Sequence, residues 1–166
     1  MKCQNSRMAQ QIILSTALGR IVLSLCADVA PQTVAHFVRL AQSKTLDGCT
    51  FYRSDFVIQF GMHGMSRKSP FPPLAVNESA ARGHLSNTRG ALAVAHWDVP
   101  DCGDSEFFIS LKENTHLDTA YGGYCVFAVV AQGDVASWAV VDKIAVAVAK
   151  GEKTRIDAVA IELIGK

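Results

Sequence analysis

Cysteine is sparse and irregularly placed in this sequence. The five cysteines are odd in number, and no two of them stand at CxxC spacing. Secreted disulfide scaffolds and structural zinc sites use evenly paired or closely spaced cysteines, so both classes are disfavoured. We therefore expect reduced thiols and a cytoplasmic protein.

Long apolar runs are also absent. No stretch reaches the roughly 20 apolar residues that span a bilayer, and the polar first eleven residues have no apolar segment typical of a secretory signal. The length of 166 residues suits one domain with one core. We expect residues 1–11 to be a disordered N-terminal segment, residues 12–166 to form the domain, and no membrane contact.

The chain has no excess of charge of one sign. Sixteen Lys and Arg against fifteen Asp and Glu give a formal charge of +1, and the longest basic cluster is Arg67-Lys68. Nucleic-acid-binding domains usually concentrate basic residues on one face, so nothing here predicts nucleic-acid binding. Hydrophobic residues make up 49 % of the chain, which is enough to build a core.

The motifs of common metal-dependent and hydrolytic enzymes are missing. None of the five histidines stands two or four residues from another, and no HExxH, GxSxG or Walker sequence occurs. The sequence therefore predicts no metal and no cofactor, and it disfavours a hydrolase.

What the sequence does contain is a series of short apolar segments separated by turns. Alternating apolar residues around Gly19 predict a β-hairpin. The predicted strands are residues 12–16, 20–25, 50–53, 56–60, 91–95, 107–111, 125–130 and 156–163. The aperiodic stretch 62–87 contains three prolines and predicts a long loop, a kind of segment that is often functional.

Two segments have helical periodicity. The first, residues 31–43, begins with Pro31, where a missing N–H is tolerated. Its apolar stripe consists of Val34, Phe37, Val38 and Ala41. The second begins after the capping residue Asp134, and its apolar face consists of Trp138, Val141, Ala145 and Val148. Many short strands with two flanking helices indicate a closed barrel, because closure removes exposed strand edges.

Several sequence blocks resemble those of cyclophilins and occur in the same order. The blocks are Phe51-Tyr52-Arg53, Phe56-Val57-Ile58-Gln59, the run 87–95 (NTRGALAVA), Ser105-Glu106-Phe107-Phe108-Ile109, Leu117-Asp118 and Tyr124-Cys125-Val126-Phe127. In cyclophilins they read F-x-R, F-x-x-Q, TRG-aliphatic-x-M-A, S-Q-F-F-I, L-D and V-F. About residues 11–164 are thus similar to a cyclophilin-type peptidyl-prolyl cis/trans isomerase.

The resemblance implies a mainly β fold, namely a closed eight-stranded antiparallel β-barrel capped by two α-helices. It also implies that the interior is packed and that proline-containing peptides bind in an outer groove. Rotation about an X–Pro amide meets a barrier of roughly 18–20 kcal/mol but breaks no covalent bond, so neither a nucleophile nor a metal is needed. A dry pocket and a donor that favours the twisted amide are needed instead.

The family match assigns the donor role to Arg53, whose guanidinium is a permanently charged fork of N–H groups. Gln59 is expected to clamp the peptide backbone, since an amide both donates and accepts. The residues expected to line the proline pocket are Phe56, Val94, Phe108 and Leu117. The remaining positions implied in substrate binding are Val57, Ala95, His96, Glu106, His116 and Tyr124.

Some positions depart from the family pattern. Arg53 and Phe56 are three residues apart, whereas the family usually separates them by five, so the turn is two residues short and the arginine head could be displaced. Glu106 replaces a Gln, which should disfavour acidic peptides if it faces the substrate. His116 replaces a Trp, which predicts weakened cyclosporin binding because an imidazole has less apolar area.

The predicted function is peptidyl-prolyl isomerisation that assists folding or conformational switching, by a monomer. The nearest alternative is a catalytically weak or inactive cyclophilin-fold scaffold that binds proline-containing partners, which the short turn and altered groove would favour. A metal-dependent or hydrolytic enzyme lacks its motifs. A small-molecule carrier barrel would require an interior with more room than Ile, Val and Phe side chains leave.

Overall fold

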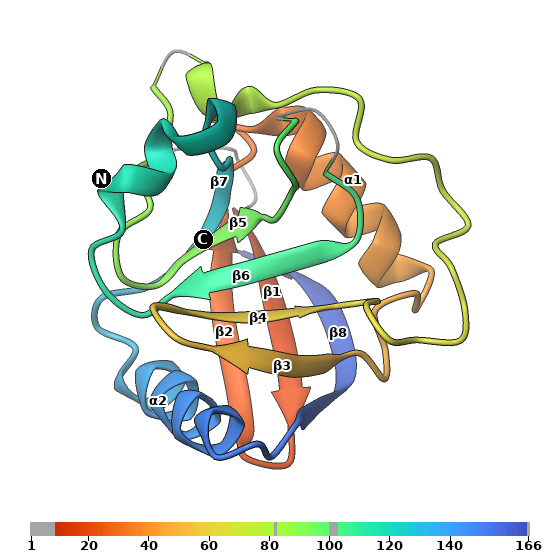
Figure 1. The fold of residues 1–166 in the computed structure, drawn as a ribbon, viewed down its shortest axis with the longest axis vertical. Coiled ribbons are helices and arrows are strands. Elements are labelled where there is room, and N and C mark those ends of the chain that lie inside the picture. The colour runs from red at the N-terminus through yellow and green to blue at the C-terminus, as the bar shows by residue number, and fades with distance from the viewer. Residues whose placement is uncertain (1–8, 82, 100–102, 166) are drawn as a thin grey trace.

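The computed structural model describes residues 9–81, 83–99 and 103–165 (Figure 1). Its strands are β1 (Ala9–Thr16), β2 (Gly19–Leu25), β3 (Thr50–Ser54), β4 (Val57–Gly61), β5 (Ala91–Val94), β6 (Glu106–Ser110), β7 (Val126–Val130) and β8 (Thr154–Ile164). They form a closed barrel in the order β1-β2-β7-β5-β6-β4-β3-β8, and every neighbouring pair is antiparallel. The predicted eight-stranded antiparallel barrel is confirmed.

The first strand begins earlier than predicted. Gln11 pairs with Ser24 of β2 on one side and with Glu162 of β8 on the other. The prediction of disorder is therefore wrong for residues 9–11. Their polar sequence does not predict a strand, but hydrogen bonds to β2 and β8 on either side hold their backbone in one. Residues 1–8 of the predicted disordered segment lie outside the described residues.

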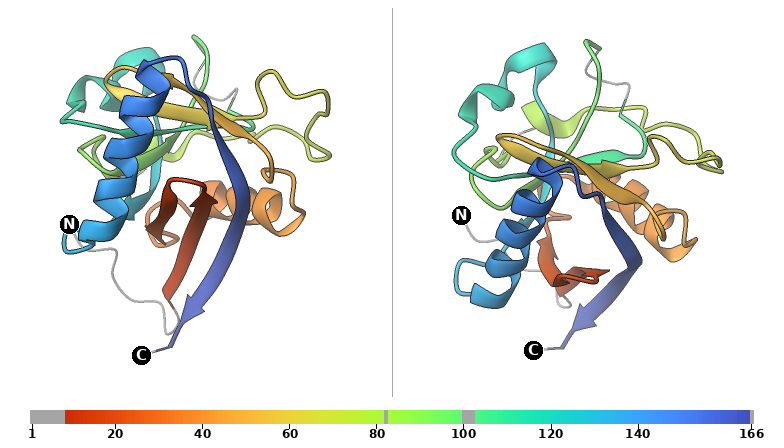
Figure 2. Two further views of the ribbon diagram at one scale, coloured as in Figure 1. Left: turned by 90° about the horizontal axis from the view of Figure 1, so that it is seen from below. Right: turned by 60° about the horizontal axis from the view of Figure 1, so that its bottom comes forward.

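The two predicted helices are present and lie at opposite ends of the barrel (Figures 1 and 2). Helix α1 (Pro31–Gln42) has proline in its first turn and buries Phe37 and Leu40. Helix α2 (Val135–Ala149) is capped by Asp134, whose carboxylate accepts bonds from Ser137 N at 3.0 Å and from Ser137 Oγ at 2.6 Å. Both helix starts are confirmed.

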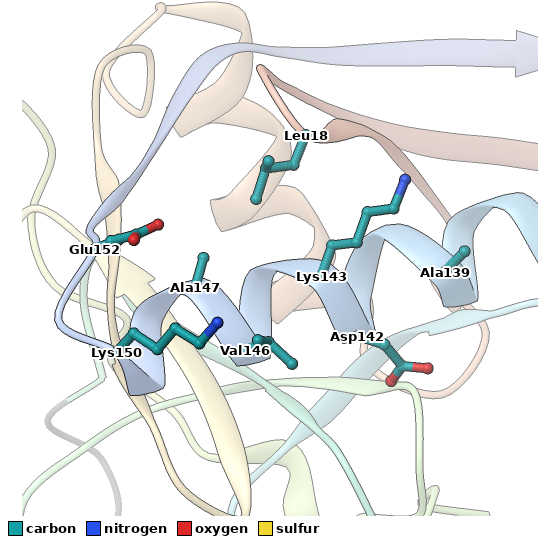
Figure 3. A pocket seen from close by; sticks show the side chains of 8 residues that line it. All are labelled: Leu18, Ala139, Asp142, Lys143, Val146, Ala147, Lys150 and Glu152. Atoms are coloured by element: carbon teal, nitrogen blue, oxygen red, sulfur yellow. The ribbon is translucent and has the colours of Figure 1, made fainter.

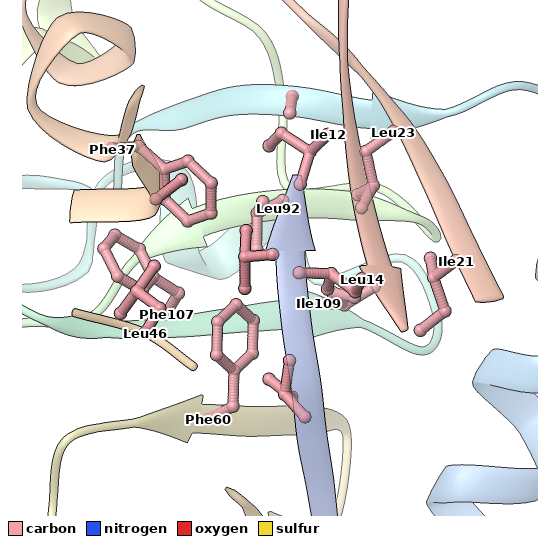
Figure 4. Close-up of a cluster of buried hydrophobic side chains, with 14 of the residues drawn as sticks. Ile12, Leu14, Ile21, Leu23, Phe37, Leu46, Phe60, Leu92, Phe107 and Ile109 are labelled. Atoms are coloured by element: carbon pink, nitrogen blue, oxygen red, sulfur yellow. The ribbon is translucent and has the colours of Figure 1, made fainter. Parts of the chain in front are cut away.

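Aromatic and aliphatic side chains fill the barrel (Figure 4). The rings of Phe37 and Phe107 meet edge to face at 4.9 Å, and the rings of Phe60 and Phe107 lie 5.7 Å apart. These three phenylalanines are fully buried. Because the packed side chains occupy the interior, ligand binding falls to the outer surface, and the carrier-barrel alternative finds no support.

Short 3-10 helices punctuate the long connections. The segment between β4 and β5 contains, among its described residues, only η1 (Glu78–Ala80) as regular structure. Two others, η2 (Thr115–Asp118) and η3 (Ala120–Gly122), lie between β6 and β7. Among the described helices, none has the length and apolar character needed to cross a membrane.

The cysteines differ in state. Cys49 and Cys125 are free and buried, and burial raises the pKa of each thiol to about 11. Cys26 is disulfide-bonded, so the prediction of reduced thiols is wrong at this residue. Sequence spacing could not reveal this bond, since disulfide formation depends on proximity in space.

Candidate active site

Strand register brings several predicted site residues into one row on the outside of the barrel. Arg53 of β3 pairs with Gln59 of β4, and Gln59 pairs with Phe108 of β6. Phe108 in turn pairs with Ala93 of β5. Side chains alternate between the two faces of a strand, so Phe108 points outward and its neighbour in β6, Phe107, points into the core.

The short turn between β3 and β4 keeps Arg53 beside Gln59. Asp55 N donates to Val57 O at 3.0 Å, and Asp55 Oδ1 accepts from Val57 N at 3.1 Å, which closes the turn tightly. A bulge interrupts β3 just before Arg53. Nη1 of Arg53 donates to Oε1 of Gln59 at 3.0 Å. Although the turn is two residues shorter than in the family, Arg53 stays in contact with Gln59.

Asp55 is a further partner of Arg53 that sequence reasoning did not identify. Its Oδ2 lies 2.9 Å from Nε and 2.8 Å from Nη2 of the guanidinium. The guanidinium carbon also lies 5.4 Å from the centroid of the Phe56 ring, a cation–π distance. The sequence signal that could have predicted this contact is a carboxylate two residues after the arginine, within a tight turn.

A chain of hydrogen bonds continues from Gln59 across the strands. Gln59 Nε2 donates to Tyr52 Oη at 2.8 Å, and the Tyr52 hydroxyl donates to Oε1 of Glu106. Burial, reinforced by the Glu106 carboxylate, raises the pKa of Tyr52 well above its ordinary value. Tyr52 therefore stays protonated and serves as a donor at every physiological pH. Sequence reasoning missed this role of Tyr52.

Glu106 fits beside β4 because Gly61 has no side chain. A Cβ at Gly61 would lie 1.7 Å from Oε2 of Glu106. The same oxygen accepts from His63 N at 3.1 Å. Among the described residues, no Lys or Arg forms an ion pair with Glu106. Its negative charge is thus held in place, next to Tyr52, without a cationic partner.

An apolar group on the outer face, here called the outer cluster, adjoins these polar residues. Its buried members are Val57, Ala91, Ala93, Phe108, Leu117 and Val126, and its half-buried neighbours include Phe56, Ala95 and Tyr124. The Phe108 ring is 4 % exposed. The structure thus unites six of the predicted substrate-binding residues around Phe108. The half-buried neighbours of the outer cluster provide apolar area that a proline ring can contact.

Val94 does not belong to the outer cluster. It is 3 % exposed and packs with the inner core, beside Leu74 and Gly103. The expectation that Val94 lines the proline pocket with Phe108 is therefore wrong, because alternation along β5 turns Ala93 and Ala95 outward and Val94 inward.

Two predicted histidines lie at the rim. The ring of His96 stacks on that of Tyr124 at 4.1 Å and 12°, and Tyr124 meets Phe108 edge-on at 5.6 Å. The ring of His116 meets that of Phe56 edge-on, also at 5.6 Å. Within the described residues, no group of three His, Cys, Asp or Glu side chains is placed to hold a metal ion.

A hydrogen-bond network holds Leu117 in the outer cluster. Its neighbour Asp118 accepts bonds from Asn87 N at 2.8 Å, from Asn87 Nδ2 at 2.9 Å and from the Ser86 hydroxyl. Asn87 is fully buried and also donates to Tyr124 O at 3.1 Å. The network ties η2 to the loop before β5, which fixes one wall of the apolar surface.

A separate hollow lies on the outer side of α2 (Figure 3). It is lined by Leu18 at the hairpin tip, by Glu152, and by α2 and its C-cap through Ala139, Asp142, Lys143, Val146, Ala147 and Lys150. None of the predicted site residues lines it. The candidate active site is therefore the outer cluster, where a cation and apolar side chains meet.

The structure is a closed antiparallel β-barrel that carries an arginine beside an apolar cluster on its outer wall. The family described as cyclophilin type peptidyl-prolyl cis-trans isomerase/CLD matches residues 11–165. The chain therefore belongs to this family, and the predicted isomerase function is confirmed at the level of the family.

Curated relatives and a solved structure agree with this assignment. The chain is 37 % identical over 129 residues to peptidyl-prolyl cis-trans isomerase cyp18 of Streptomyces antibioticus, which covers 72 % of this chain and 76 % of the relative. It is 34 % identical over 142 residues to peptidyl-prolyl cis-trans isomerase B of Escherichia coli (strain K12), and this match covers 80 % of this chain and 82 % of the relative. A Cryptosporidium parvum cyclophilin type isomerase structure shares the fold, with a TM-score of 0.77 at 20 % identity over 93 % of this chain and 98 % of that one.

Proposed function

We propose that this peptidyl-prolyl cis/trans isomerase binds X–Pro peptides over the outer cluster and lowers the rotation barrier through Arg53. The observation that carries the proposal is the placement of Arg53 and Gln59 in one strand row with the buried Phe108 ring. The row puts a permanently charged donor next to an apolar surface of the kind that a proline ring requires.

The chemistry needs only binding and electrostatics. Uncatalysed X–Pro exchange takes tens to hundreds of seconds, so reaching milliseconds means roughly five decades, or about 7 kcal/mol off the barrier. Arg53 would hold the proline carbonyl and favour a pyramidal nitrogen, which weakens amide resonance. The apolar floor around Phe108 would desolvate the ring and strengthen that electrostatic interaction.

The guanidinium has donors left for this task. Arginine carries five N–H groups. Nε donates to Oδ2 of Asp55, Nη2 is in ion-pair contact with the same oxygen, and one hydrogen on Nη1 serves Gln59. One N–H on each terminal nitrogen is left over. These two form the fork that would receive the peptide oxygen, while Gln59 Nε2 keeps a second hydrogen for the backbone.

Proline-containing peptides and proteins are the proposed ligands. The Cryptosporidium parvum isomerase was crystallised in the presence of the dipeptide Ala-Pro, which supports this ligand class by analogy. We also propose weakened cyclosporin binding because of His116, and a monomeric state that sedimentation can test. The proposed cytoplasmic location is supported by the buried free thiols of Cys49 and Cys125 but not by the disulfide bond of Cys26, and fractionation would test it.

The first experiment is an exchange assay on X–Pro peptides that compares the wild type with Arg53→Ala and Arg53→Lys. We expect each variant to lose most of the activity, about a hundredfold for a displaced or missing catalytic group, since lysine keeps the charge but not the fork. Arg89→Ala is the matched control, because Arg89 also pairs with an aspartate and an aromatic ring but lies outside the row. Full activity in Arg53→Ala would refute the assignment.

A proline-binding scaffold is the second candidate function. The observation that favours it is the neutralisation of Arg53 by Asp55, which offsets part of the positive charge available to a substrate. A wild type that binds X–Pro peptides, seen by NMR titration, but does not accelerate their exchange would establish the scaffold and reject the isomerase mechanism.

A further inference from the structure

We infer that Asp55 is a positioning residue that holds the Arg53 guanidinium in its working orientation and so compensates for the shortened turn. The inference rests on the proposed catalytic role of Arg53. It concerns a residue outside the family motifs described above, since Asp55 occupies the turn where this chain is two residues shorter.

The two carboxylate oxygens of Asp55 have separate partners. Oδ1 accepts from Val57 N at 3.1 Å and stabilises the turn. Oδ2 faces the guanidinium, 2.9 Å from Nε and 2.8 Å from Nη2. One side chain thus links the backbone of the turn to the head of Arg53. The link restricts the rotation of a long and otherwise flexible side chain, and pre-organisation of this kind is what positions catalytic groups.

Three contacts surround the guanidinium. Asp55 binds its Nε edge, Gln59 accepts from Nη1 at 3.0 Å, and the Phe56 ring lies 5.4 Å from its central carbon. Gln59 alone would leave the plane of the guanidinium free to rotate about a single bond. The second anchor from Asp55 fixes that plane.

Stability does not account for this ion pair. The side chains of Arg53 and Asp55 are 44 % and 43 % exposed, and ion pairs exposed to solvent contribute little to folding. A purely structural role would therefore rest on Oδ1 and its bond to Val57 N. The orientation of Arg53 rests on Oδ2, so substitution can separate the two roles.

Asp55→Asn and Asp55→Ala make this separation. Asparagine keeps an oxygen that can accept from Val57 N but places an amide donor against the Arg53 donors. Alanine loses both interactions. We expect both variants to lose about tenfold in kcat/KM, less than the roughly hundredfold that a displacement of 1 Å can cost, because Gln59 still anchors Nη1. We expect only Asp55→Ala to lower the thermal midpoint, by about 2–4 °C.

Asp142→Asn provides a matched control outside the site. Asp142 of α2 accepts from Arg89 at 3.2 Å, and the Arg89 guanidinium carbon lies 4.8 Å from the centroid of the Trp138 ring, so the same combination of side chains recurs outside the site. We expect wild-type kcat/KM in this variant. Asp55→Asn with wild-type kcat/KM would overturn the inference, because the turn bond alone would then suffice.

A double-mutant cycle identifies the route of the effect. If Asp55 acts through Arg53, Asp55→Asn should cost nothing further in an Arg53→Ala background. A full tenfold loss in that background would overturn the inference, since Asp55 would then act on the substrate directly.

The Nε–H resonance of Arg53 gives a readout that needs no turnover. We expect slow solvent exchange of this proton in the wild type and fast exchange in Asp55→Asn. Equal exchange in both proteins would overturn the inference whether or not the chain isomerises peptides. Slow exchange in an inactive wild type would instead preserve the contact and reject the proposed function.

Discussion

Arg53 and Gln59 lie opposite each other in the register of β3 and β4, with 3.0 Å between Nη1 and Oε1. The contact fixes the orientation of the Gln59 amide, because its oxygen must face the arginine and its nitrogen must face Tyr52. The hydrogen bonds therefore run in one direction, from Arg53 to the carboxylate of Glu106.

Tyr52→Phe should weaken catalysis without touching the arginine. The variant removes the hydroxyl that accepts from Gln59 Nε2 and donates to Glu106, so both hydrogen bonds are lost. The loss of the bond to Gln59, about 1 kcal/mol, lets the amide reorient. We expect kcat/KM on X–Pro peptides to fall about fivefold, as a change of 1 kcal/mol in the barrier dictates. Tyr121→Phe, in η3, is the control. Unchanged kcat/KM in Tyr52→Phe would show that Gln59 needs no anchor from this side.

Peptide charge should affect turnover through Glu106. The charges of Arg53 and Asp55 offset each other, so the net charge of Arg53, Asp55 and Glu106 together is the negative charge of the Glu106 carboxylate. Two charges 4 Å apart in water interact by about 1 kcal/mol, so peptides with Glu beside the X–Pro unit should turn over about fivefold more slowly than those with Gln, and about thirtyfold more slowly than those with Lys.

Glu106→Gln should abolish this difference, and added salt should reduce it by screening. Glu162→Gln, an exposed change on β8, should preserve it. A peptide panel measured at low and high salt is the test. Equal rates for acidic and basic peptides in the wild type would remove Glu106 as a selectivity element.

His116→Trp should improve cyclosporin binding. The imidazole of His116 meets the Phe56 ring edge-on at 5.6 Å, and an indole there would add apolar area and one N–H donor. An aromatic contact of this kind adds about 1 kcal/mol, which corresponds to a gain of about fivefold in affinity. Calorimetric titration of both proteins decides the question, and no gain in affinity would refute the expectation.

Acid should weaken the fold through Asp118. Burial alone would raise the pKa of this carboxyl, but the hydrogen bonds from Ser86 and Asn87 outweigh burial, and the pKa lies below its ordinary value. A lowered folded-state pKa stabilises the protein fully above the unfolded pKa of about 3.9, and the stabilisation disappears as the pH falls through the folded value.

Asp118→Asn should therefore lower the free energy of unfolding at pH 7 and have a diminishing effect as the pH falls below about 4. Urea titrations of both proteins at pH 7 and pH 3 measure the difference. Asp142→Asn, whose exposed carboxylate lies on α2, is the control. An equal loss at both pH values would mean that the network does not depend on the charge of Asp118.

Local pattern was enough to predict most of the elements, whereas the site residues were predicted from the family resemblance. Gly19 marked the hairpin, Asp134 marked the start of α2, and alternating apolar residues marked β2. In each case the decisive property is carried by neighbouring residues, through capping, turn formation or the alternation of a strand.

What the sequence could not provide depends on contacts between segments. Tyr52 reaches Glu106 only because β3, β4 and β6 are adjacent, and the bulge before Arg53 is set by pairing with β4. The error at Val94 had a different origin. Alternation along β5 predicts that Val94 points inward, whereas the family match predicts a place for it in the proline pocket.

The position of β8 between β1 and β3 has a consequence for how the protein reaches its folded state. Leu14, in the first strand, pairs with Val159, in the last strand of the described residues. During synthesis, β1 emerges from the ribosome long before its second neighbour exists, so one edge of the nascent sheet stays open until β8 arrives. Such distant pairing is slow. A protein of the isomerase family therefore needs a slow, long-range closure in its own folding.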